Sequence, residues 1–186
     1  ENSKVGDYNS NGKVERAIRV VGNMVRTLKS ALAENANMTM NLDMNIVPWM
    51  VRHAAYLITR CRVRSCGKTS LQLIKGRKSL TELVPFGETS MFKIPKSSQV
   101  VGSFEERWET GVWVGTTIRK GVSLIGTPTG VYKLGTIRRK PDGEQWSQEM
   151  INGMAGSPQQ PEPGVGTRRI TTFAKTNLRP RRRDHQ

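Results

Sequence analysis

One acidic side chain, Glu15, occupies a position from which it could bind a metal ion or cap a helix. Residues 9–16 (NSNGKVER) form a polar, glycine-containing turn that leads into an amphipathic segment, and Glu15 falls in the first turn of the expected helix. A carboxylate at that position caps free backbone amides and offsets the helix dipole. A carboxylate is also a ligand that hard divalent cations prefer. Helix cap and metal ligand are therefore the two roles to weigh for Glu15.

Basic side chains follow this acid at helical spacing. Steps of three and four residues place three cations on the side of the helix that Glu15 heads, so that the acid begins a basic ridge. Two further cations lie within two residues of Glu15. The predicted nucleic-acid contacts on this helix are Lys13, Arg16, Arg19, Arg26 and Lys29.

The charge of the whole chain points to the same class of partner. The 186 residues carry a net charge of +15 and an isoelectric point near 10.5, and such an excess of Lys and Arg favours a polyanion such as nucleic acid. Residues 179–183 (RPRRR) form a basic arm in which Arg181, Arg182 and Arg183 are predicted to bind phosphates without reading base sequence. The alternatives are a solvated basic surface and a solvated tail.

The remaining reactive side chains form no recognisable constellation. Cys61 and Cys66 lack a second Cys or His pair, so their spacing disfavours a zinc site and predicts free thiols in a reducing compartment. His53 stands among apolar neighbours and is predicted to be a core or groove histidine rather than a ligand. No apolar run approaches the roughly 20 residues of a membrane span, and no signal peptide is visible.

Two long helices are expected to position the basic ridge. Apolar residues recur at steps of three and four from Val14 to Leu32, and a second, more apolar helix is predicted from Val47 and Pro48 to about residue 64. The asparagine-rich residues 34–45 separate the two. We expect exposed apolar surface on both helices.

The second half of the chain predicts a small β structure. Residues 65–88 are expected to form an ordered connector, and residues 89–140 an antiparallel barrel or rolled sheet with Trp108 and Trp113 in its core. Base stacking by these tryptophans is the alternative. Residues 141–186 are predicted to be a disordered basic tail. The expected strands are residues 91–94, 108–115, 122–125 and 131–137, with a hairpin turn at 126–130.

The order of these pieces resembles the integrase of copia-type retrotransposon polyproteins. Residues 10–17 (SNGKVERA) are similar to the last catalytic motif of that family, and residues 49–60 (WMVRHAAYLITR) are similar to its Trp-containing helix. Thr59 and Ser70 depart from the family's usual Asn and Pro. The resemblance covers about residues 5–140. Its other blocks are residues 67–71 (GKTSL), 86–87 (FG), 107–115 (RWETGVWVG) and 126–130 (GTPTG).

The resemblance implies an α+β fold in which residues 1–64 are the last helices of an RNase H-like catalytic core and residues 89–140 form an SH3-like β-barrel. It also implies DNA integration, by a DDE-type site in which two Asp and one Glu hold Mg²⁺ or Mn²⁺. Glu15 would be the catalytic, metal-binding Glu. Both Asp would precede this sequence, so we expect no tight metal binding, and no catalysis, by this fragment alone.

The implied partners are the DNA of the element ends and of the target, with a second copy of the parent protein. The implied location is nuclear or cytoplasmic rather than secreted. The alternative is a non-catalytic, basic nucleic-acid-binding module in which Glu15 is a helix-cap residue.

Overall fold

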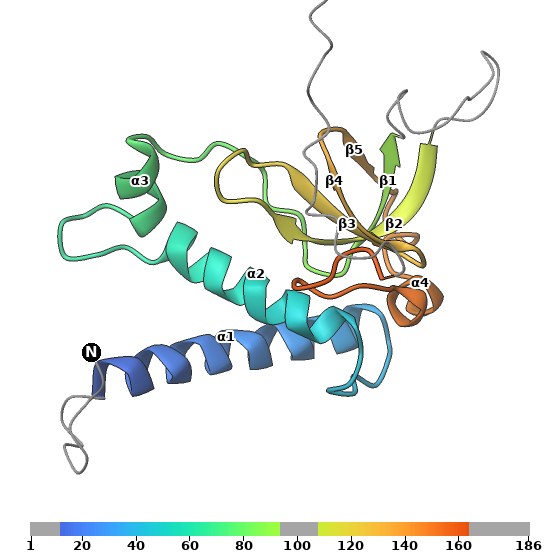
Figure 1. The fold of residues 1–186 in the computed structure, drawn as a ribbon, viewed down its shortest axis with the longest axis horizontal. Coiled ribbons are helices and arrows are strands. Elements are labelled where there is room, and N and C mark those ends of the chain that lie inside the picture. Colours follow the sequence, from blue (N-terminus) through green and yellow to red (C-terminus); the bar gives the residue numbers. More distant parts are fainter. Residues whose placement is uncertain (1–11, 94–107, 164–186) are drawn as a thin grey trace, which may run out of the picture.

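The computed structural model describes residues 12–93 and 108–163. These two ranges contain four helices and one open, five-stranded antiparallel sheet, which confirms the predicted α+β class. Figure 1 shows the two long helices on one side of the sheet. No helix within the described ranges is long and apolar enough to span a membrane.

The first helix, α1 (Gly12–Asn35), is unbroken over 24 residues. Its apolar side chains recur at the predicted steps, but burial is confined to its C-terminal half: Leu32 is 1% exposed, whereas Ile18 is 66% exposed. The expected exposed apolar surface on this helix is therefore confirmed. After the helix, the chain turns at Asn37, whose φ of 48° lies in the left-handed region that asparagine tolerates.

The second helix, α2 (Ile46–Cys61), lies between α1 and the sheet (Figure 1). Pro48 occupies its first turn, where a missing N–H breaks no intrahelical bond. Trp49 and Met50 are each 1% exposed, so α2 is the more buried helix, as predicted. Val51 remains 44% exposed, which confirms apolar surface on this helix too.

A short third helix, α3 (Ser70–Lys75), forms inside the segment expected to be a connector. Thr69 and Gln72 build a capping box: the Gln72 N–H donates to the Thr69 hydroxyl at 3.2 Å, and the Thr69 N–H donates to the Gln72 side-chain oxygen at 2.8 Å. Gly76 ends the helix with a φ of 72°, a conformation that favours glycine.

The five strands follow the predicted runs closely. The predicted run 131–137 is two strands, because the chain turns at Gly135 and Thr136 and crosses to the far edge of the sheet. The spatial order of the five strands is β4-β3-β2-β1-β5, and every neighbouring pair is antiparallel. The strands are β1 (Thr89–Lys93), β2 (Trp108–Thr116), β3 (Ser123–Thr127), β4 (Gly130–Leu134) and β5 (Ile137–Arg139).

The hairpin turn predicted at residues 126–130 joins β3 to β4. Pro128 and Thr129 form the turn, and the Thr127 hydroxyl donates to the Gly130 carbonyl at 3.0 Å and accepts from the Thr129 N–H at 3.3 Å. These side-chain bonds replace backbone partners that a tight turn removes. The turn chemistry therefore fixes the register of Thr127 opposite Gly130.

The prediction that the chain is disordered from residue 141 is wrong for residues 141–163. This segment contains α4 (Gln148–Gly153), and Ile151 and Met154 are each 1% exposed. The Trp49 indole N–H donates to the Gly156 carbonyl at 2.9 Å, and the Val131 N–H donates to the Pro161 carbonyl at 2.8 Å. These partners come from α2 and β4, so the segment's own composition could not reveal them. Residues 164–186 lie outside the described part of the chain.

Alternate residues of the strands enter two apolar clusters. Val112 and Val114 pack with Leu32, Trp49 and Ile151 in a core shared by helices and sheet. The intervening Trp113 packs in a second cluster on the other face. Tyr132 and Ile137, from opposite edges of the sheet, both pack against that second cluster, so the sheet curves around it. The remaining members of the second cluster are Val84, Phe92, Ile125 and Leu134.

Candidate nucleic-acid interface

The basic ridge on α1 lies on an exposed and continuous helix face. Glu15, Arg19 and Arg26 are exposed and Lys29 is half-buried. Lys29 lies 14 positions after Glu15, which corresponds to about 21 Å along a helix axis. The Arg26 guanidinium donates to the Asn23 side-chain oxygen at 2.7 Å, which holds it against the helix surface. The ridge therefore presents three cations in one row.

Two predicted contacts on the same helix do not join this row. Lys13 and Arg16 are exposed, but they are two residues and one residue from Glu15. Neighbours at those spacings lie on different sides of a helix. They place positive charge around the first turn rather than along the ridge. The predicted contacts Arg181, Arg182 and Arg183 lie outside the described residues.

Glu15 is exposed in the first turn of α1. Among residues 12–93 and 108–163, no group of three His, Cys, Asp or Glu side chains could hold a metal ion. A Mg²⁺ or Mn²⁺ centre for phosphoryl transfer needs several oxygen ligands. Glu15 by itself does not fit such a centre, and within the described ranges its carboxylate offsets the helix dipole.

A second basic surface, which the sequence did not reveal, lies at the loops beyond α3. Two segments that are far apart in sequence meet around a surface hollow with a volume of about 410 Å³. We call this hollow the cationic cup. No residue that lines it is acidic. The lining residues are Lys75, Arg77, Lys78, Ser79, Leu80, Thr81, Arg119, Lys120 and Gly121.

The backbone on both sides of the cationic cup is held in place by hydrogen bonds. On the side of the β2–β3 turn, the Gly121 N–H donates to the Thr117 carbonyl at 2.9 Å, and the Val122 N–H donates to the Thr117 hydroxyl at 3.0 Å. On the other side, the Arg60 guanidinium donates to the Thr81 carbonyl. The same guanidinium donates to the Tyr56 hydroxyl at 3.1 Å. Helix α2 therefore anchors one wall of the cup.

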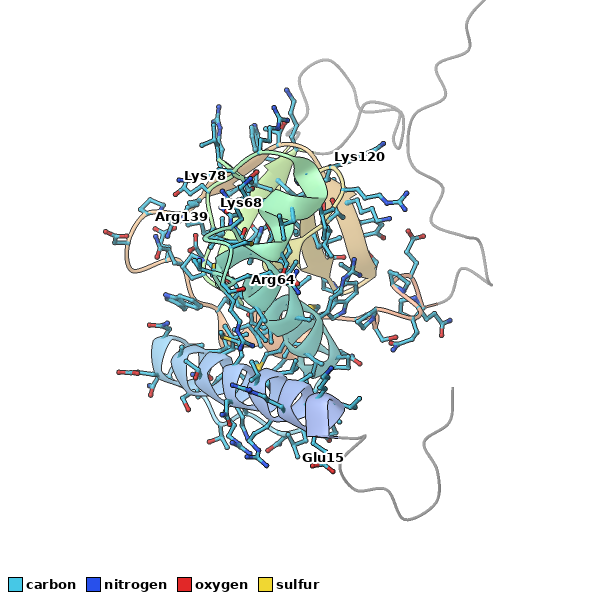
Figure 2. The ribbon with its side chains drawn as sticks, turned by 90° about the vertical axis from the view of Figure 1, so that its left-hand side faces the viewer. Glu15, Arg64, Lys68, Lys78, Lys120 and Arg139 are labelled. Carbon is cyan, nitrogen blue, oxygen red and sulfur yellow. The ribbon has the colours of Figure 1, made fainter. Side chains whose placement is uncertain are left out.

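Further cations lie on the same end of the molecule. Arg64 and Lys68 close the turn between α2 and α3, where the Arg64 N–H donates to the Lys68 carbonyl at 3.0 Å. Figure 2 shows Lys68, Lys78 and Lys120 around α3, while Glu15 lies at the opposite end of the view. The basic surface of the described residues thus has two centres, the α1 ridge and the cationic cup.

The predicted core position of His53 is confirmed. Its ring is 3% exposed and lies between Phe86, at 5.3 Å between ring centroids, and Trp113, at 5.1 Å. Burial lowers the pKa of His53 to about 4, so the ring is neutral near pH 7. Its Nδ1 atom has no hydrogen-bond partner among the described residues. His53 is therefore a packing residue of the α2–sheet contact.

The two tryptophans expected in the sheet core differ. Trp113 is 1% exposed and is a core residue, as predicted. Trp108 is only half-buried, and the Arg138 guanidinium lies 4.5 Å from its ring centroid. A stacked guanidinium is a cation–π contact, so Trp108 belongs to the surface at the start of β2 rather than to the core. Cys61 and Cys66 are free thiols, as predicted, and both are exposed.

Comparisons with protein families, with curated proteins and with solved structures find no match to this chain.

Proposed function

We propose that this chain is the C-terminal part of a copia-type integrase and that its own activity is the binding of DNA through backbone phosphates. The observation that carries the proposal is the α1 ridge, in which an unbroken exposed helix starts with Glu15 and continues through Arg19, Arg26 and Lys29. Such a row suits a phosphate backbone, which repeats its charges along one line.

Two features of the fold support the integrase assignment. The chain passes from two long helices to a curved antiparallel sheet in the order β4-β3-β2-β1-β5, which suits helices from an RNase H-like core followed by an SH3-like barrel. Val14 and Ile18 on α1 are 59% and 66% exposed, and apolar surface of this kind needs a covering layer. In the complete parent, that layer would be the sheet that carries the two Asp.

In that parent, Glu15 would be the third carboxylate beside two Asp, and Mg²⁺ or Mn²⁺ would supply the activation of water and of the 3′-hydroxyl. This chain's own contribution is to hold Glu15 at the start of a rigid helix and to align DNA along the ridge. We further propose that the parent acts as a homo-oligomer in the nucleus or cytoplasm.

A salt titration of DNA binding tests the activity of the chain itself. The logarithm of the binding constant should fall linearly with the logarithm of salt concentration, by about 0.9 for each phosphate neutralised. Changing Arg19, Arg26 and Lys29 together to Gln should make this slope shallower by roughly two to three units. A slope near zero for the unchanged chain would contradict DNA binding by phosphate neutralisation.

A non-catalytic nucleic-acid-binding module is the second candidate, and the isolation of Glu15 from other carboxylates among the described residues favours it. The two candidates are separated by translating the reading frame upstream of Glu1 and searching for two Asp on predicted strands. In an intact parent, Glu15→Gln should abolish metal-dependent strand transfer while leaving DNA affinity unchanged. Unchanged strand transfer would assign Glu15 to helix capping.

A further inference from the structure

The cationic cup gathers like charges that have no partner within the described residues. Lys75, Arg77 and Lys78 approach it from α3 and the following loop, and Arg119 and Lys120 approach it from the β2–β3 turn. In the described ranges, ion pairs form only between Arg139 and its two Glu partners, so none involves these five cations. Cations that face a common hollow repel one another, and a bound anion would relieve that repulsion.

The scaffold, rather than the side chains, brings these charges together. The capping box and Gly76 fix both ends of α3, and Arg60 fixes the loop at Thr81. Gly121, with a φ of 68°, closes the opposite turn. Because the backbone holds the two segments before any ligand arrives, binding would order only the ends of the Lys and Arg side chains.

The form of the cup favours a polymeric phosphate ligand over an enclosed small molecule. Small-molecule sites are mostly apolar and largely enclosed. The cup is a surface hollow whose one large apolar lining residue, Leu80, is 95% exposed. Figure 2 also shows Arg64 and Lys68 on the same side of the molecule as Lys78 and Lys120. An extended anion with repeated charges can contact the cup together with Arg64 and Lys68.

We propose that the cationic cup binds backbone phosphates of a nucleic-acid duplex and is a second contact surface, separate from the α1 ridge. Lys75, Lys78 and Lys120 make the principal contacts, and Leu80 packs against the sugar face of the backbone. The proposal rests on the proposed function, because it assigns a further part of the same nucleic-acid interface.

The test compares four versions of the full chain. The cup variant changes Lys75, Lys78 and Lys120 to Gln, and the ridge variant changes Arg19, Arg26 and Lys29 to Gln. A control variant removes the same amount of charge elsewhere, at Lys93, Lys133 and Lys140. Circular dichroism and thermal unfolding first establish that each variant folds like the unchanged chain. Fluorescence anisotropy then follows the binding of a labelled duplex DNA at several salt concentrations.

The cup variant should bind the duplex roughly tenfold to a hundredfold more weakly near 0.1 M salt, with a salt slope shallower by about two to three units. The control variant should lose clearly less affinity for the duplex than the cup variant. If the cup and control variants lose equal affinity, the cup makes no local contact and the inference is overturned. If the ridge variant weakens binding and the cup variant does not, the proposed function stands and only the cup is refuted.

Failure of the proposed function would give a different result, because the unchanged chain would then show no salt-dependent binding to the duplex.

A competition experiment distinguishes a nucleic-acid ligand from a free phosphate compound. Inorganic pyrophosphate at the same total phosphate concentration should displace the duplex poorly. Efficient displacement by pyrophosphate, lost in the cup variant, would identify a small-anion site and overturn the assignment to nucleic acid.

Discussion

The guanidinium of Arg139 donates two parallel hydrogen bonds to the carboxylate of Glu88, from Nε to Oε1 at 2.8 Å and from Nη2 to Oε2 at 2.9 Å. Glu88 is fully buried immediately before β1, and Arg139 ends β5. The hydrogen bond to Glu88 raises the pKa of Arg139 above its ordinary value. This forked pair therefore joins the last strand of the sheet to the first.

Removing Arg139 should destabilise the fold more than neutralising Glu88. Arg139→Met leaves a buried carboxylate without its cation and should lower the free energy of unfolding by about 2–4 kcal/mol. Glu88→Gln leaves a guanidinium that still reaches solvent, and should cost about 1–2 kcal/mol. The double variant Glu88→Gln with Arg139→Met should recover part of the loss. Urea denaturation measures all three.

Glu82 provides the matched control for this pair. Its carboxylate lies 3.7 Å from the Arg139 Nη1 atom, but its side chain is 78% exposed. Because exposed ion pairs contribute little, Glu82→Gln should change stability by less than about 0.5 kcal/mol. Equal effects of the Glu82 and Glu88 changes would show that burial does not set the strength of the pair.

Gly156 and Gly153 should respond in opposite ways to alanine. Gly156 has a φ of 87°, and a Cβ there would clash with the Pro161 backbone carbonyl, so Gly156→Ala should cost roughly 2 kcal/mol or more. A Cβ on Gly153 would meet no atom within 4 Å, so Gly153→Ala should be neutral or stabilising by up to about 1 kcal/mol. Thermal unfolding of both variants checks whether residues 153–161 belong to the folded unit, and two neutral substitutions would place them outside it.

Stability should depend on pH through His53. Its pKa is about 4 in the folded chain and about 6.5 when unfolded, so below pH 6.5 the unfolded state binds the extra proton. The contribution of the neutral ring is fully present above pH 6.5 and is lost as the pH falls toward 4, amounting to about 3 kcal/mol. Urea denaturation across this range measures the loss.

His53→Phe is the control for this pH dependence. Phenylalanine keeps an aromatic ring between Phe86 and Trp113 but cannot be protonated. The variant should therefore lose less stability than the unchanged chain between pH 7 and pH 4. If the free energy of unfolding of the two proteins changed in parallel with pH, His53 would not be the source of the pH dependence.

The two ends of α1 should differ in their contribution to stability. Leu32 is 1% exposed and packs against Gly87, so Leu32→Ala should cost about 2–4 kcal/mol. Ile18 is 66% exposed, so Ile18→Ala should change the free energy of unfolding by less than about 0.5 kcal/mol. Chemical denaturation of the two variants makes the comparison, and a large loss from Ile18→Ala would show that the N-terminal half of the helix packs in solution.

Periodicity was sufficient to predict the long elements. The apolar spacing of Val14 to Leu32 predicted α1, because a helix that covers a core repeats every three to four residues. Val and Ile runs bounded by glycine predicted the strands, and the turn residues Pro128 and Thr129 predicted the β3–β4 hairpin. A single run was expected where β4 and β5 lie, because apolar residues continue on both sides of Gly135, whereas the pairing of β5 with β1 depends on residues far away in the sequence.

Features that depend on distant partners could not be predicted in the same way. Residues 141–163 are polar and proline-containing, and they are ordered by Trp49, Val131 and other residues far away in the sequence. The cationic cup likewise joins two short basic segments about 40 residues apart, neither of which stands out in so basic a chain. The α3 capping box, Thr69 with Gln72, was the one local signal that could have been read.

The hydrogen bond from Val131 to Pro161 also bears on how the chain avoids self-association. An open sheet presents unpaired backbone groups along its two outer strands, and these recruit strands from other molecules. Residues near Pro161 shield β4, and β5 has only three residues and carries Arg138 and Arg139. Both outer strands are thereby poor templates for edge-to-edge aggregation. The two long helices, by contrast, carry exposed apolar side chains at Val14, Ile18 and Val51.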